Sequence, residues 1–285
     1  MNKVAIVSDS SAYIPKEYVD QYNLSIVPLT VNWQGKSYYD GVDIQATEFY
    51  QQLAESKEMA TTSQVTVGQF LEVFTKLLDE GKDVFYMGIS TGLSATCDSA
   101  VQAKKELGDP KNLIIMDTRI VSMALTLMVI EVARAAEKGA TLDECYQLAL
   151  DAYPRIGVYF TVSTLEYLHR GGRINSAKRL LGSVLNLKPI MMIRDGKIEL
   201  VESVRSQKKA LNRMVELIEK DIAGRKPVRL GPFHALAFDE MVAMEEIAIE
   251  RLHPIEVIRS EVSPVIGSHV GPGTVSMAYI VDKAA

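Results

Sequence analysis

The sequence predicts an α/β protein of two domains, the first built on a parallel sheet and the second a mixed α/β domain. In the first half, short apolar runs alternate with amphipathic segments, a pattern typical of a parallel sheet covered by helices. In the second half, an Asp-Gly turn joins two apolar runs, which indicates an antiparallel hairpin. The 285 residues are enough for two modest domains. A linker at Pro154–Gly157 places them at residues 1–155 and 156–285.

The elements of the first half follow from their apolar spacing. Four runs predict strands: Lys3–Val7, Ile26–Val31, Val84–Ile89 and Leu113–Met116. Three amphipathic segments predict helices: Phe49–Ser56, Val67–Leu78 and Ala95–Leu107. Thr66 and Gln69 have capping-box spacing at the start of the second helix. The apolar stretch Ile120–Ala133 is shorter than the ~20 residues that span a bilayer and predicts a core helix. This order indicates a Rossmann-like first domain.

The second half mixes strands and helices. Its predicted strands are Val158–Val162, a hairpin of Ile190–Arg194 and Lys197–Val204 around Asp195-Gly196, and Glu256–Ser260. Its predicted helices are Ser176–Leu187, Lys208–Ala223 and Met241–Leu252. The segment Pro264–Gly273 has two prolines and three glycines around His269, and it predicts a rigid loop that aims one imidazole.

Composition excludes several classes of function. The net charge of −5 argues against nucleic acid, which favours a basic surface. Cys97 and Cys145 belong to no disulfide framework or zinc motif, which suits a reducing compartment. The spacing of the histidines does not indicate a metal site. No phosphate-binding or dinucleotide motif is present, so we expect no cofactor. The first residues lack the ~7–15 apolar residues of a signal peptide. We therefore expect a soluble, cytoplasmic protein.

Hydroxyl side chains cluster at the predicted carboxyl ends of the strands. The clusters are Ser8–Ser11, Thr61–Ser63 and Ser90–Thr96. Open α/β sheets bind ligands at this edge, and helix N-termini there attract anions. Each cluster taken alone also fits a set of helix caps and turn residues. Together they favour a site for an anionic group.

Gly88–Gly92 reads G-x-S-x-G between a strand and a helix, the setting of a hydrolase nucleophile. The alternative function is therefore a serine hydrolase acting on acyl esters, with Ser90 as nucleophile and a histidine such as His234, His253 or His269 as base. No His-Gly-Gly-Gly-type oxyanion loop precedes it. A sugar- or nucleotide-binding module is a third possibility.

Seven segments in a specific order resemble the DegV family nearly from end to end. They are residues 7–12 (VSDSSA), 61–64 (TTSQ), 89–94 (ISTGLS), 165–174 (LEYLHRGGRI), 187–190 (LKPI), 204–205 (VR) and 264–273. Members of this family bind fatty acids, and some are the acyl-carrying subunit of a bacterial fatty acid kinase. The resemblance implies two α/β domains with the acyl chain buried between and inside them.

The resemblance also implies roles for particular residues. Thr62 and Ser94 are expected to hydrogen-bond the carboxylate of a long-chain fatty acid, with His269 in contact with it. Arg205 and Arg173 are expected near the head group or the contact with a partner. Ser90 then belongs to the turn and is no nucleophile. The chain would present the carboxylate to a separate ATP-dependent kinase and hold the acyl phosphate, without being an enzyme itself.

An acyl chain needs a buried apolar tunnel. Leu181, Leu185 and Ile190 are candidates for its lining, from the stripe of the predicted Ser176–Leu187 helix and the strand after it. Burial of ~14 methylenes at roughly 0.8 kcal/mol each would supply about 11 kcal/mol gross, so affinity would come from the tail. We also expect the Ser176–Leu187 helix to act as a lid that opens for ligand exchange, with transient membrane contact.

Overall fold

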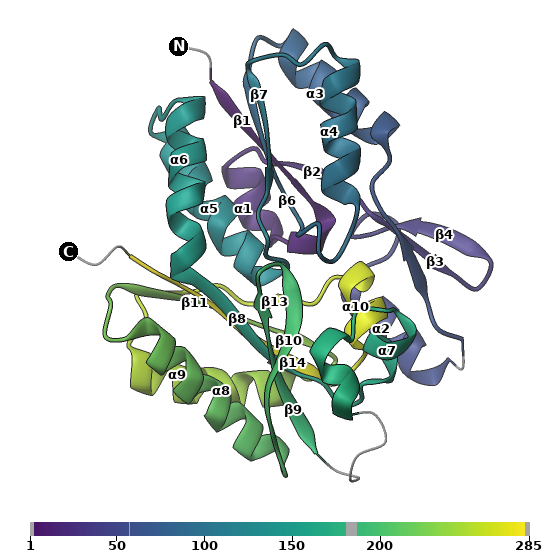
Figure 1. The fold of residues 1–285 in the computed structure, drawn as a ribbon, viewed down its shortest axis with the longest axis vertical. Helices are drawn as coiled ribbons and strands as arrows, with labels where there is room; N and C mark the ends of the chain where they lie inside the picture. The colour runs from purple at the N-terminus through teal and green to yellow at the C-terminus, as the bar shows by residue number, and fades with distance from the viewer. Residues whose placement is uncertain (1–2, 57, 181–186, 283–285) are drawn as a thin grey trace.

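The computed structural model describes residues 3–56, 58–180 and 187–282. Figure 1 shows two tiers: the first half of the chain forms the upper one, and the strands from residue 156 onward form the lower one. Each tier is a sheet with helices against it, so the predicted two-domain α/β fold class is confirmed.

The upper sheet is parallel, with the order β2-β1-β6-β7. Its strands are β1 (Val4–Asp9), β2 (Ser25–Val27), β6 (Asp83–Gly88) and β7 (Leu113–Asp117). Its helices are α1 (Lys16–Gln21), α3 (Val67–Asp79), α4 (Thr96–Glu106), α5 (Met123–Glu137) and α6 (Leu142–Ala152). In Figure 1, α3 and α4 cover one face of the sheet, and α5 and α6 cover the other. The predicted capping box at the start of α3 is present.

The predicted strand Ile26–Val31 is wrong as a single element. Pro28 interrupts it, since proline has no N–H to donate to a ladder and is disfavoured inside a sheet. β2 therefore ends at Val27, and the chain enters a second, small sheet with the order β4-β3-β5. That sheet consists of β3 (Thr30–Trp33), β4 (Lys36–Tyr39) and β5 (Thr61–Ser63), with α2 (Ala46–Glu55) between β4 and β5 in the chain.

The lower sheet is mixed, with the order β10-β9-β8-β14-β11-β12 and with β13 also paired to β11. Its strands are β8 (Ile156–Thr161), β9 (Lys188–Arg194), β10 (Lys197–Val204), β11 (Val228–Ala235), β12 (Glu256–Val257), β13 (Ser260–Glu261) and β14 (Thr274–Val281). The predicted hairpin is confirmed as β9 and β10. Asp195 and Gly196 have φ of 49° and 77°, the positive values that a type I′ turn requires. The predicted strand Glu256–Ser260 is divided into β12 and β13.

The lower sheet has a core on each face. One face packs against α8 (Gln207–Ile222) and α9 (Phe238–Leu252), and the other packs against α5 of the upper tier. The larger core of buried residues includes side chains from both tiers. β8 begins next to the predicted division after residue 155, and the exact domain limits stay a prediction.

Two more predicted elements of the second half differ from the structure. The rigid loop predicted for residues 264–273 is wrong, because Pro264–Val270 forms the helix α10. Pro264 suits the first turn, and the Ser263 hydroxyl accepts a hydrogen bond from the Ile266 N–H. The other change concerns the predicted helix Ser176–Leu187. Its described part is a 3₁₀ helix, Asn175–Leu180, which follows the short helix α7 (Glu166–Arg170).

Within the described residues, no helix is long and apolar enough to cross a membrane. The same part of the chain holds no group of three or more histidine, cysteine or acidic side chains placed to bind a metal ion.

Candidate functional site

A cavity of about 420 Å³ lies where the two tiers and the small sheet meet. It is lined from the upper tier, from β5, from the lower sheet and from α10. Its apolar lining consists of Leu29, Ile89, Leu93, Ala95, Val121, Val158, Phe160, Ile193, Ile198, Phe233, Val262, Val265, Ile266 and Val270. Its polar lining consists of Thr62, Ser63, Gln64, Ser94, Ser122, Arg173, His269, Thr274 and Ser276. A mostly apolar cavity with a few polar groups is the usual form of a small-molecule site.

Thr62 and His269 lie together at this cavity. The Thr62 Oγ1 is 2.9 Å from the His269 Nε2, a hydrogen bond between residues 207 apart in the sequence. Thr62 reaches it from β5, which pairs Thr62 with Val31 of β3. His269 reaches it from α10, whose N-terminus is fixed by the Ser263 cap. The structure therefore brings together two of the three residues predicted to hold a carboxylate.

Arg173 connects His269 to the segment that carries Ser94. Its Nε donates to the Leu93 carbonyl at 3.1 Å, and its Nη1 donates to the Gly171 carbonyl at 2.6 Å. A Cβ on Gly171 would lie 2.2 Å from the His269 Nδ1, so only glycine lets the backbone pass this close to the ring. Ser94 and Arg173 both line the cavity with Thr62 and His269. The predicted carboxylate residues and one predicted arginine thus share one site.

The electrostatics of the site favour a neutral histidine. Burial and then the charge of Arg173 lower the pKa of His269 from 6.5 to about 4. The imidazole is therefore neutral near pH 7, with one ring nitrogen protonated. Its Nδ1 has no hydrogen-bond partner among the described residues. The positive charge at this site comes from Arg173, while Thr62, Ser94 and His269 offer polar groups without net charge.

A second hollow opens beside these polar groups. It has a volume of about 300 Å³ and shares Leu93, Ser94, Ala95 and Arg173 with the cavity. The rest of its lining is Thr91, Gly92, Gly172 and Asn175. Thr91, Gly92, Gly172 and Asn175 are exposed, so this hollow lies at the surface. The part of the cavity lined by Ser94 and Arg173 is therefore the part close to solvent.

Other predicted residues lie elsewhere. Arg205 is exposed after the end of β10 and is not part of the cavity lining, so of its two predicted places, at the head group or at the contact with a partner, only the second stays a prediction. Ile190 is also corrected: it is fully buried in the core under α8 and α9, on the opposite face of β9 from the cavity. Leu181 and Leu185 fall outside the described residues, as does half of the predicted lid, residues 181–186.

The apolar lining that sequence reasoning missed includes Ile193 and Ile198. They are cross-strand partners on either side of the Asp195-Gly196 turn, so they share one face of the hairpin. Successive side chains of a strand point to opposite faces, so Ile190 and Ile193, which are three residues apart, must lie on opposite faces of β9. That signal was present in the sequence, but it does not say which face of the hairpin meets the upper tier.

Ser90 has a structural role. Its hydroxyl donates to the Gly196 carbonyl at 2.8 Å and accepts from the Gly92 N–H at 3.1 Å, and the side chain is 1% exposed. This contact fixes the hairpin turn of the lower sheet against the turn after β6. None of the four histidines, all of which are described, is hydrogen-bonded to Ser90. The geometry thus gives no support to the serine-hydrolase alternative.

The first hydroxyl cluster, Ser8–Ser11, does not reach the cavity. It surrounds two buried carboxyl groups instead: Ser11 hydrogen-bonds Asp9, and the Ser10 hydroxyl donates to Asp40 at 2.6 Å. The other Asp40 oxygen accepts the Val265 N–H of α10 at 3.2 Å. Burial raises the pKa of Asp40 to about 7. Asp40 was not predicted from sequence, and it anchors the helix that carries His269.

The sequence and the fold both have known relatives. The family model described as "uncharacterised protein, DegV family" matches residues 3–282. A DegV domain-containing protein of Caldanaerobacter subterraneus is 34% identical over 282 residues, which cover 98% of this chain and 99% of the relative. The protein DegV of Bacillus subtilis is 30% identical over 278 residues, which cover 97% and 98%.

Solved structures agree with this comparison. A fatty acid-binding DegV family protein of Thermus thermophilus has a TM-score of 0.92 at 31% identity and covers 98% of this chain and 100% of its own. A stearic acid-binding protein of Eubacterium ventriosum has a TM-score of 0.91 at 26% identity, with 99% and 98% covered. With a family model that matches almost the whole length and relatives above 30% identity, this chain belongs to the DegV family.

Proposed function

We propose that this protein binds one long-chain fatty acid, with its carboxylate at Thr62, Ser94 and His269 and its acyl chain in the 420 Å³ cavity. The observation that carries the proposal is a mostly apolar cavity in which Thr62, Ser94, His269 and Arg173 all take part in the lining, with Ser94 and Arg173 also lining the surface hollow. The fatty acids named for the Thermus and Eubacterium relatives support the same ligand class.

The head group needs donors to replace water, because a buried carboxylate is costly unless it is hydrogen-bonded. Two hydroxyls and an imidazole N–H supply up to three donors, and Arg173 adds a positive charge close by. His269 would change its partner on binding, since its Nε2 is bonded to Thr62 in this structure. A bound carboxylate would also raise the pKa of His269, opposing the effect of burial.

We further propose that the protein acts as a carrier for a separate ATP-dependent kinase. The surface hollow at Ser94 and Arg173 supports this step, because it leaves the carboxylate end within reach of a second protein. The kinase would transfer a phosphoryl group from ATP to a carboxylate oxygen, and the acyl phosphate would stay bound through its tail. The chain itself contributes binding and orientation.

Two measurements test these steps. Mass spectrometry of gently purified protein should find one fatty acid per chain, and a polar ligand or none would contradict the proposal. Incubation with ATP, magnesium and oleate should yield acyl phosphate only when a fatty acid kinase is added. Acyl phosphate formed by the purified chain alone would contradict the carrier role.

A further inference from the structure

A third hollow lies behind one wall of the cavity. It has a volume of about 160 Å³ and is lined by Arg119, Ile120, Tyr153, Pro154, Ile156, Gly157, Val158, Ile193, Arg194 and Asp195. Val158 and Ile193 also line the cavity. These two side chains therefore form a wall with a hollow on each side.

The wall is a matched pair on neighbouring strands. β8 and β9 are antiparallel, with Tyr159 opposite Met192 and Phe160 opposite Met191, so Val158 and Ile193 stand opposite each other one step further. Tyr159 belongs to the core under α8 and α9, and alternation places Val158 and Ile193 on the other face, toward the cavity.

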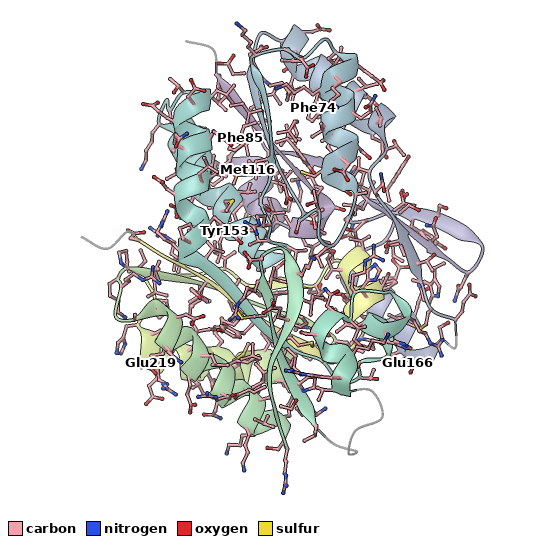
Figure 2. All side chains as sticks on the ribbon, in the orientation of Figure 1. Phe74, Phe85, Met116, Tyr153, Glu166 and Glu219 are labelled. Carbon is pink, nitrogen blue, oxygen red and sulfur yellow. The ribbon has the colours of Figure 1, made fainter. Side chains whose placement is uncertain are left out.

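The third hollow opens to the surface, since Arg119, Pro154, Arg194 and Asp195 of its lining are exposed, and polar contacts between the tiers border it. The Arg119 guanidinium donates to the Asp195 carboxylate at 2.9 Å and lies 5.5 Å from the centre of the Tyr153 ring. Figure 2 labels Tyr153 where the chain passes from α6 toward β8. The hollow is thus held between the turn of the hairpin, the start of β8 and the loop after β7.

We propose that Val158 and Ile193 set the longest acyl chain that the cavity accepts, and that the third hollow is the space into which a longer chain would extend. The proposal rests on the proposed binding of a fatty acid. In the proposed binding mode the carboxylate lies beside Ser94 and Arg173, which also line the surface hollow, so the acyl chain runs into the rest of the cavity. Displacing a lining side chain that packs against other core atoms costs free energy, because interiors are close-packed. Val158 and Ile193 instead border a hollow of about 160 Å³ on their other side.

The size of the effect follows from the atoms removed. Val158→Ala deletes two carbon atoms and Ile193→Ala deletes three, so we expect the bound chains to lengthen by about two and about three carbons. Each additional methylene should raise affinity by at most about fourfold, which corresponds to roughly 0.8 kcal/mol for full burial. Val158→Ile adds one carbon and should shorten the preferred chain by about one carbon.

The experiment offers the purified protein an equimolar mixture of saturated fatty acids of increasing length and identifies the retained acids by mass spectrometry. Ile190→Ala is the matched control, because it deletes the same atoms from the same strand on the face under α8 and α9. We expect longer acids in Val158→Ala and Ile193→Ala, shorter acids in Val158→Ile, and the wild-type distribution in Ile190→Ala.

The outcomes separate the two proposals. If the wild type retains fatty acids but the wall variants match Ile190→Ala, the proposed wall is refuted while fatty acid binding stands. If Ile193→Ala does not fold, the milder Val158→Ala and the opposite shift in Val158→Ile still decide the question. Absence of fatty acid from every form, wild type included, would refute both proposals.

Discussion

The hydroxyl of Thr62 offers the sharpest test of the proposed site. Thr62→Val keeps the shape of the side chain and removes its only polar atom. In the unliganded protein this breaks the 2.9 Å contact with the His269 Nε2. Since the His269 Nδ1 already lacks a partner among the described residues, the ring loses its remaining side-chain partner. We expect the free energy of unfolding to fall by about 1–3 kcal/mol, the cost of an unsatisfied buried group.

Fatty acid binding should weaken without being abolished. A hydrogen bond to a charged group contributes about 1.5–3 kcal/mol, so the Kd should rise by roughly 10- to 150-fold. Burial of the tail, at roughly 0.8 kcal/mol per methylene, outweighs this loss for a long chain. The structure therefore predicts that Thr62→Val still takes up fatty acid at saturating concentration.

The assay is displacement of a fluorescent fatty acid, followed at pH 7.5, where the lowered pKa of His269 keeps its imidazole neutral in the unliganded protein. Thr61→Val is the matched control, because Thr61 is the exposed neighbour on the same strand and does not line the cavity. Thr62→Ser should restore most of the affinity. Equal affinity of Thr62→Val and Thr61→Val would refute the assignment of the carboxylate to Thr62.

Three further predictions concern Asp40, Gly171 and Ser90. The folded-state pKa of Asp40 is about 7 against an unfolded 3.8, so its contribution to stability is complete below pH 3.8 and is lost as pH rises to about 7. Asp40→Asn should remove this loss, at most about 4 kcal/mol, and denaturant titrations at pH 5 and pH 8 would detect it. Gly171→Ala should raise the Kd for fatty acid by about tenfold or more, because its Cβ would displace His269, whereas Gly68→Ala, which meets no atom within 4 Å, should not. Ser90 should resist fluorophosphonate labelling, and Ser90→Ala should lower the free energy of unfolding by about 1 kcal/mol through the lost bond to Gly196 while fatty acid is still bound. Labelling of Ser90 would revive the hydrolase alternative.

Local chemistry made much of the fold predictable. The Asp195-Gly196 turn, the Thr66 capping box and the alternation of strands with helices all depend on residues close together in the sequence. The failures have local causes as well: Pro28 divides a predicted strand, and the Ser263 cap with Pro264 starts a helix where glycines and prolines had indicated a loop.

The site itself depends on tertiary structure. By itself, the sequence determined most strands and helices of both tiers, because hydrogen bonding and apolar periodicity act over a few residues. It did not predict β5, which carries Thr62, or α10, which carries His269. It could not decide that Thr62 meets His269 across 207 positions, or that Ile193 rather than Ile190 faces the cavity. Nor could it decide that His269 is neutral, since its pKa depends on how far burial and Arg173 disfavour the charged ring. The Thr62–His269 contact, the face of β9 that lines the cavity and the pKa of His269 all depend on which surfaces of the two tiers are in contact. Those contacts are set by the packing of the whole chain.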